Sequence, residues 1–305
     1  MFREGEDSMA KKHKTDDGHG IILPIERKDK ATRIIYFISY TILTLLAVIC
    51  LFPPLWTFLS AFKNIKEFLM TPPTIIPRSF EPWKFAEAWK KTDFGRSYLN
   101  TLIMGGGNVL FSLTINGLAG YVLSRLKPKG SRFVFMLVTW TMMMPTSVKM
   151  VPLFMTFVDL PLLHINLTNT FLPFWIMSGA SCFYVLLFKS FFDSIHISYL
   201  EAARIDGCSE LGIFYKIILP LSKPVMFSVA VFVMNGIWGD FLWPYLILTN
   251  ENLYTTGIKI YKLQGATTQD MYFMAMIFVT IPPVIMYFTF QKYLMKGLSL
   301  GGVKG

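Results

Sequence analysis

The chain has 305 residues, of which 53% are hydrophobic and only 16% are charged, and its mean hydropathy is +0.48. A typical soluble domain carries about 25% charged residues, so this composition excludes an ordinary water-soluble protein and indicates a membrane protein. The formal net charge of +10 does not predict nucleic-acid binding, because no basic stripe with interleaved aromatic residues occurs outside the apolar segments. Basic loops of a membrane protein set its orientation and meet anionic lipid headgroups.

Residues 1–33 carry eight basic and seven acidic side chains and predict a mostly disordered tail, with no cleavable signal peptide. Six apolar segments of 19 to 29 residues follow, and a helix needs roughly 20 residues to cross a bilayer. They lie near residues 34–62, 97–124, 133–158, 170–188, 224–249 and 271–290. The predicted fold is therefore an all-α, polytopic membrane domain over residues 34–305 with six transmembrane helices.

Breaks and small residues mark several of these segments. Pro53-Pro54 predicts a kink in the first, and Pro145 and Pro152 interrupt the third. The run Gly105-Gly106-Gly107 in the second predicts close helix packing. Between the first two segments, Trp83 and Trp89 stand at helical spacing, which predicts a short interfacial helix below the outer headgroups.

The distribution of Lys and Arg predicts that both termini are cytoplasmic. With that orientation, 18 basic residues fall in the inside segments (1–33, 125–132, 189–216 and 292–305) and 9 in the outside segments. Cytoplasmic loops carry the excess of positive charge in membrane proteins. We therefore expect a multi-pass protein of a bacterial-type plasma (inner) membrane with a cytoplasmic C-terminal tail over residues 292–305.

The loop over residues 193–216, between the fourth and fifth segments, has the most informative sequence. Residues 199–206 predict a short helix, which Gly207 ends in a left-handed turn. Ser209 is suited to cap the helix that follows. The small residues Ala202 and Ala203 would let this element seat closely in a groove on a partner.

This loop also carries a family resemblance. Glu201-Ala202-Ala203, three residues, Gly207, and then Phe214 and Pro220 closely resemble the EAA signature of the permeases of ATP-binding cassette (ABC) importers. The resemblance implies that the loop is a coupling helix that docks on a separate ATPase subunit. By the same resemblance, the residues in that role are Glu201, Ala202, Ala203, Asp206 and Gly207.

Other motifs resemble the maltose-type sugar permeases within that class, over roughly residues 34–305. They are Pro53-Pro54-Leu55-Trp56, Asn100-Thr101, Ala119-Gly120-Tyr121 with Arg125, the segment from Pro145 to Leu153, and the tail from Gly297 to Gly305. The resemblance implies the fold of a type I importer permease, with Gly301, Gly302 and Lys304 near the ATPase. Implied partners are a second homologous permease, two ATP-binding subunits, an extracytoplasmic sugar-binding protein and the bilayer, with no nucleic acid.

The sequence contains no motif of an ATPase or another enzyme. It contains no Gly-Lys dipeptide, so the phosphate-binding loop of an ATPase is absent. We predict no enzymatic activity, no catalytic residue, no metal site and no cofactor on this chain, with ATP and Mg²⁺ bound by the partner ATPase. The resemblance implies that the chain is the channel subunit of a di- or oligosaccharide importer that works by alternating access.

Alternative substrates are a polyol, glycerol phosphate or an acidic oligosaccharide. A secondary carrier would show two matching halves with broken helices, and a membrane-embedded enzyme would need a catalytic cluster at one depth. The sequence shows neither.

Polar side chains inside apolar spans are costly and usually face a cavity or a partner. Asn235, Trp238 and Leu242 have the spacing of one helical face, which would line the pore. The alternative for each asparagine is an interhelical hydrogen bond, and for Trp238 an interfacial aromatic belt. Trp238-Gly239-Asp240 departs from the Trp-Asn-acidic pattern of many sugar permeases. Candidates for the substrate path are Asn108, Asn116, Thr146, Ser147, Lys149, Asn235, Trp238 and Asp240.

Lys149 is a cation within the third segment. It either snorkels outward, pairs with an acid such as Asp240, or meets an anionic substrate.

Overall fold

The computed structural model describes residues 30–301, which form helices and connecting loops without a named β-strand. Within this part of the chain, the one β-type pairing is an isolated bridge between Leu160 and Ile165. The all-helical class predicted from the sequence is confirmed. The chain divides into two compact units, residues 1–56 and residues 57–305.

The first unit contains most of α1 (Lys30–Ala61), which continues through Pro53 and Pro54. Its apolar stretch, Thr32–Ala61, has a mean hydropathy of 2.5. The apolar side chains from Ile34 to Leu55 on this helix are exposed, as expected of a helix that meets lipid or another protein chain.

Two further helices are long and apolar enough to cross a membrane. One is the continuous run Phe94–Leu126, which comprises α4 (Phe94–Phe111), η2 (Ser112–Asn116), α5 (Gly117–Tyr121) and η3 (Val122–Leu126). The other lies within α16 (Gln269–Gly301). Together with α1, these correspond to the first, second and sixth apolar segments of the sequence.

The other three segments are bent pairs of helices. α6 (Ser131–Met143) and α7 (Thr146–Val158) meet at 107°, and α8 (Leu172–Gly179) and α9 (Cys182–Ser194) at 42°. The run Glu210–Leu221, made of α11 (Glu210–Ile213), η4 (Phe214–Ile218) and α12 (Leu219–Leu221), meets α13 (Lys223–Gly239) at 71°. Counting each pair as one span gives six spans.

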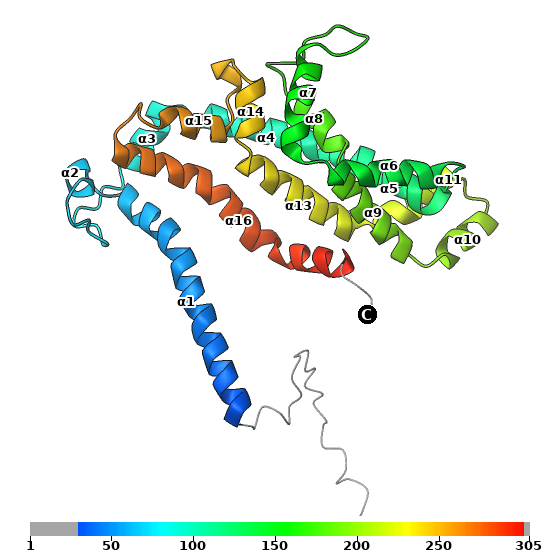
Figure 1. Cartoon of the computed structure of the whole chain (residues 1–305), viewed down its shortest axis with the longest axis horizontal. Coiled ribbons are helices and arrows are strands. Elements are labelled where there is room, and N and C mark those ends of the chain that lie inside the picture. The colour runs from blue at the N-terminus through cyan, green and yellow to red at the C-terminus, as the bar shows by residue number, and fades with distance from the viewer. Residues whose placement is uncertain (1–29, 302–305) are drawn as a thin grey trace, which may run out of the picture. The chain divides into compact units, whose positions relative to one another are not determined.

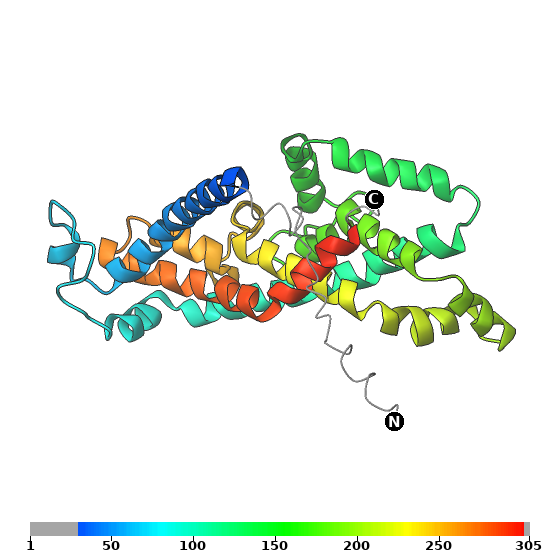
Figure 2. The same cartoon turned by 90° about the horizontal axis from the view of Figure 1, so that it is seen from below.

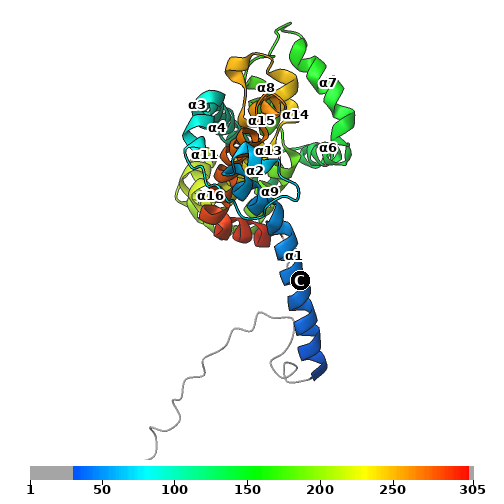
Figure 3. The ribbon, with the colours of Figure 1, turned by 90° about the vertical axis from the view of Figure 1, so that its left-hand side faces the viewer.

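Two breaks are sharper than the sequence indicated. Figure 3 shows the corner between α6 and α7, which falls immediately before Pro145. Proline lacks an amide hydrogen and forces the preceding residue out of the helical region, so the helix ends there. The fifth segment also ends early, because α13 stops at Gly239 and the separate short helix α14 (Leu242–Ile247) follows.

Helices α4, α13 and α16 lie side by side, and α5 packs on α9 (Figures 1 and 2). A Cβ built on Gly105 would lie 2.5 Å from Met234 Sδ, and one on Gly107 would overlap the indole of Trp175. Gly106 has open space instead. The close packing expected of this glycine run is therefore confirmed at two of its three positions.

Polar side chains at the start of α4 hold the loop that leads into α15 (Thr256–Leu263). Asn100 Nδ2 donates to the carbonyl oxygens of Asn252 and Tyr254, at 2.8 and 3.1 Å. Thr101 Oγ1 accepts from the amide of Thr256 at 3.0 Å. The Asn100-Thr101 motif thus joins two segments far apart in the sequence.

The segment between α1 and α4 contains α2 (Ile65–Phe68) and α3 (Lys84–Thr92). The short helix expected around Trp83 and Trp89 is present as α3, and Trp89 packs against Phe94, Tyr98 and Phe278. Lys84 Nζ lies 2.5 Å from Asp270 Oδ2, which joins α3 to the start of α16.

Glu67 organises the loop beside these helices. Its carboxylate accepts hydrogen bonds from Thr74 Oγ1, from the amides of Arg78 and Ser79, and from Ser79 Oγ, at 2.7–3.0 Å. Burial opposes ionisation of this group, but the four donors outweigh it and lower the pKa of Glu67 to about 2.

Candidate functional site

The loop that resembles a coupling helix folds as two short helices with a tight turn. α10 (Ser198–Ile205) ends where the amide of Cys208 donates to Ala203 O at 2.9 Å and that of Gly207 to Arg204 O at 3.0 Å. This is a Schellman motif, and Gly207 takes its left-handed position with φ +79°. Ser209 Oγ accepts from the amide of Gly212 at 3.2 Å. Both expected features, the glycine turn and the serine cap, are confirmed.

The two faces of α10 have different environments. Leu200 and Ala203 are buried in the core of the chain. Glu201, Ala202, Asp206 and Gly207 are exposed. The small surface expected from the alanine pair is therefore divided, because Ala203 packs inward and only Ala202 faces outward.

An ion pair joins α10 to α11 on the exposed side of this loop. Arg204 Nε donates to Glu210 Oε1 at 2.8 Å, and Arg204 Nη2 lies 3.3 Å from Glu210 Oε2. The hydrogen bond from the guanidinium to Glu210 raises the pKa of Arg204. The pair fixes the end of α10 against the start of α11.

Aromatic packing and a guanidinium connect this element to the apolar spans. The ring of Tyr121 lies 4.9 Å from that of Phe214 and 6.0 Å from that of Phe192. Arg125 Nη2 donates to the carbonyl oxygens of Phe192 and Ile195, at the end of α9. The motif from Ala119 to Arg125 thus holds the end of α9, from which the chain leads into α10.

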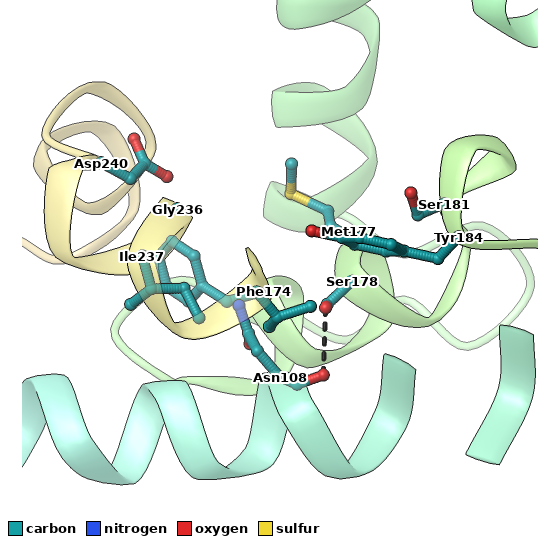
Figure 4. A pocket seen from close by; sticks show the side chains of 10 residues that line it. Asn108, Phe174, Met177, Ser178, Ser181, Tyr184, Gly236, Ile237 and Asp240 are labelled. Atoms are coloured by element: carbon teal, nitrogen blue, oxygen red, sulfur yellow. Dashed lines mark hydrogen bonds between the residues drawn. The ribbon is translucent and has the colours of Figure 1, made fainter. Parts of the chain in front are cut away.

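A cavity of about 250 Å³ lies between α4, α8, α9 and α13 (Figure 4). Side chains from all four helices line it, so it is a joint feature of three predicted spans. The lining residues are Asn108, Phe174, Met177, Ser178, Ser181, Tyr184, Val233, Gly236, Ile237 and Asp240.

The polar groups of the cavity are few and differ in character. Asn108 is 7% exposed, and its Oδ1 is buried without a hydrogen-bond partner in the described structure. Its main-chain oxygen accepts from Ser178 Oγ at 3.0 Å. Asp240 Oδ1 accepts from the amide of Trp243 at 3.4 Å, at the start of α14. Phe174 and Tyr184 add aromatic rings.

Two of the predicted substrate-path residues, Asn108 and Asp240, line the cavity. Asn116 does not, because Nδ2 donates to Ser178 O at 2.8 Å and Oδ1 accepts from the amide of Ser181 at 3.1 Å. This is the interhelical alternative. Trp238 is buried, and its Nε1 donates to Val279 O on α16 at 3.0 Å. It does not line this cavity.

The remaining candidates lie apart. Thr146 and Ser147 are exposed at the start of α7, and Asn235 is exposed on α13. The predicted face of Asn235, Trp238 and Leu242 is wrong, since α13 ends before Leu242.

Lys149 Nζ donates to Thr141 O at 3.1 Å, at the corner of α6 and α7. No ion pair joins it to Asp240 among the described contacts. In the predicted tail, Gly301 is the last described residue, and Gly302 and Lys304 lie outside the described residues.

The cavity also contains residues that the sequence reasoning missed. Phe174, Ser178, Ser181 and Tyr184 lie on the bent pair α8–α9. A signal was available, because Ser178-Gly179-Ala180-Ser181 interrupts an otherwise apolar segment with small and polar residues.

Comparison with known proteins identifies the family. Residues 115–300 match the family model described as binding-protein-dependent transport system inner membrane component. The chain is 31% identical to the arabinooligosaccharides transport system permease protein AraQ of Bacillus subtilis (strain 168), over 89% of this chain and 97% of that protein. It is 30% identical to the maltodextrin transport system permease protein MalD of Streptococcus pneumoniae (strain ATCC BAA-255 / R6), over 90% and 97%.

A solved structure has the same fold. A chain of a bacterial ABC transporter involved in the import of the acidic polysaccharide alginate superposes with a TM-score of 0.77 and 23% identity, over 87% of this chain and 98% of that one. At this identity the likeness concerns the fold alone. The family match covers the loop over residues 193–216, three of the four cavity-lining helices (α8, α9 and α13) and nearly all of the long last helix. The chain belongs to the binding-protein-dependent transport system inner membrane components, as an integral membrane permease.

Proposed function

We propose that this chain is one of two channel-forming subunits of an ATP-driven importer of di- or oligosaccharides. The observation that carries the sugar assignment is the cavity between α4, α8, α9 and α13. Its aromatic rings match the apolar faces of sugar rings, and its amide, hydroxyl and carboxylate groups match sugar hydroxyls. The arabinooligosaccharide and maltodextrin permeases among the relatives support the same substrate class.

The proposed topology has six spans, with each bent pair counted as one span. Both termini are cytoplasmic, with a tail over residues 1–33, a membrane domain over residues 34–305, a coupling loop over residues 193–216 and a second tail over residues 292–305. The Lys and Arg distribution supports this orientation in a bacterial inner membrane.

The proposed mechanism is alternating access driven from the cytoplasm. Separate ATPase subunits bind ATP and Mg²⁺, close, and push on the exposed side of α10. Glu201, Asp206 and Gly207 lie on that side. The buried side of α10 passes the movement inward through the contact between Phe214 and Tyr121.

The proposed assembly contains a second homologous permease, two ATP-binding subunits and an extracytoplasmic sugar-binding protein, in the bilayer. Ala202, from its exposed position, contributes the small surface against the ATPase, while Ala203 supports it from inside the fold. Gly301, Gly302 and Lys304 in the tail complete that contact.

Co-purification from native membranes together with an uptake assay tests this proposal. We expect an ATPase and a second permease to accompany the chain, and removal of its gene to abolish ATP-dependent uptake of at least one of radiolabelled arabinotriose, maltotriose and raffinose. Purification of the chain alone, with uptake driven by a proton gradient, would instead indicate a secondary carrier.

A further inference from the structure

The lining of the cavity carries a negatively charged side chain and no positively charged one. Asp240 supplies a carboxylate, and none of the ten lining residues is Lys, Arg or His. The intramembrane cation Lys149 is not among them, and its ammonium group donates to the carbonyl of Thr141. A ligand in the cavity therefore meets a negative charge with no compensating positive charge in the lining.

Two acceptors of the cavity are available to a ligand that carries hydrogen-bond donors. A carboxylate such as that of Asp240 only accepts hydrogen bonds. Asn108 Oδ1 is a second acceptor, and it is buried without a partner. A buried acceptor left unpaired is costly, so a donor from a ligand would be favoured at this position.

We propose that Asp240 and Asn108 form a subsite that accepts uncharged, hydroxyl-rich sugar units and rejects anionic ones. This inference rests on the proposed function and narrows its substrate class. A sugar hydroxyl donates to either oxygen, and the rings of Phe174 and Tyr184 receive the apolar face of the sugar. A carboxylate or phosphate on the ligand has no donor to offer and is repelled by Asp240, most strongly when the cavity is closed to water.

The position of Gly236 allows a test that does not depend on knowing the sugar. Gly236 lines the cavity one helical turn before Asp240, and a Cβ built on it meets nothing within 4 Å. Gly236→Cys therefore introduces a thiol without a clash. Cys50, Cys182 and Cys208 are replaced by alanine beforehand, and the complex is purified with its partners to show that it assembles.

The measurement is the rate at which this thiol reacts with two methanethiosulfonate reagents, one bearing trimethylammonium and one bearing sulfonate, in vesicles of either orientation. We expect the cationic reagent to react faster relative to the anionic one. Asp240→Asn should lower that ratio by about three- to tenfold, as expected for loss of one charge a helical turn away.

A matched control uses Gly106→Cys, because Gly106 also has open space around it but does not line the cavity. Its reagent ratio should not respond to Asp240→Asn. An unchanged ratio at position 236 would overturn the proposal, and so would a thiol at that position that reacts from neither side of the membrane.

Protection by sugars gives a second test. The measurement is how far each compound slows modification of the Gly236→Cys thiol during ATP-driven turnover. Three uncharged sugars (arabinotriose, maltotriose and raffinose) are compared with two anionic compounds (alginate trisaccharide and glycerol phosphate). The proposal expects no protection by the two anionic compounds. Protection by alginate trisaccharide would contradict the subsite and leave the proposed sugar import intact. Sugar uptake that does not depend on this chain would contradict the proposed function itself.

Discussion

The carboxylate of Glu67 shows how much a single residue can organise in a loop. It is 5% exposed and accepts four hydrogen bonds from three residues that lie 7 to 12 positions further along the chain. Hydrogen bonds to a charged acceptor are stronger than those between neutral groups. The conformation of residues 72–79 therefore depends on one ionised side chain.

This dependence predicts a pH effect. The pKa of Glu67 is lowered from 4.5 to about 2 in the folded loop, so its stabilisation is fully present above pH 4.5 and is lost as the pH falls towards 2. Glu67→Gln should expose residues 72–79 to protease at neutral pH. Glu87→Gln is the control, because Glu87 pairs with Lys91 on an exposed helix surface, where ion pairs contribute little. Equal protection of both variants would contradict the prediction.

Gly207 carries a second prediction at the scale of one residue. Its φ of +79° costs an alanine roughly 1–2 kcal/mol but is easier for asparagine. Gly207→Ala should leave the protein in the membrane, reduce its co-purification with the ATPase, and lower uptake several-fold. Gly207→Asn should retain more of both. If Gly207→Ala disappears from the membrane, the turn serves folding and the coupling interpretation of this variant fails.

At the scale of elements, close packing of α5 on α9 gives a third prediction. A Cβ on Gly120 would lie 2.7 Å from Phe188 Cβ, 3.0 Å from the amide nitrogen of Lys189 and 3.2 Å from Val185 O, so it would meet the backbone of α9 and an atom attached directly to it. Overpacking costs about 1–3 kcal/mol even where side chains can adjust. Gly120→Leu should lower the detergent-solubilised unfolding temperature markedly, whereas Gly106→Leu should leave it nearly unchanged. Comparable losses in both would show that leucine disturbs this helix wherever it stands.

The elements also show which features the sequence can predict. The Gly207 turn, the Ser209 cap and helix α3 depend on neighbours within a few residues, and all three were predicted. The environment of Trp238 was not, since its bond to Val279 depends on where α16 packs. The pore face through Leu242 failed because helical spacing was extended past a helix end that the sequence marks only weakly.

At the scale of the whole chain, the apolar pattern predicted six spans but not their shape. In the structure, three of the six predicted segments are bent pairs of helices, and the 42° bend between α8 and α9 places Ser178, Ser181 and Tyr184 around the cavity. Periodicity cannot reveal such a bend, because it is set by contacts with other helices. Asn108 and Asp240 were therefore among the predicted substrate-path candidates, whereas the residues that the cavity takes from α8 and α9 were not.

One amide makes that bend possible. Asn116 in η2 donates to Ser178 O and accepts from the amide of Ser181, on either side of the break between α8 and α9. Asn116 thus bonds to two backbone groups that the broken helix cannot satisfy itself. In an apolar environment these groups would otherwise have no hydrogen-bond partner. Straightening the broken helix would leave the Asn116 amide without these two partners, and removing the amide would leave the two backbone groups at the break without theirs. The shape of the cavity therefore depends on two features of separate helices at once.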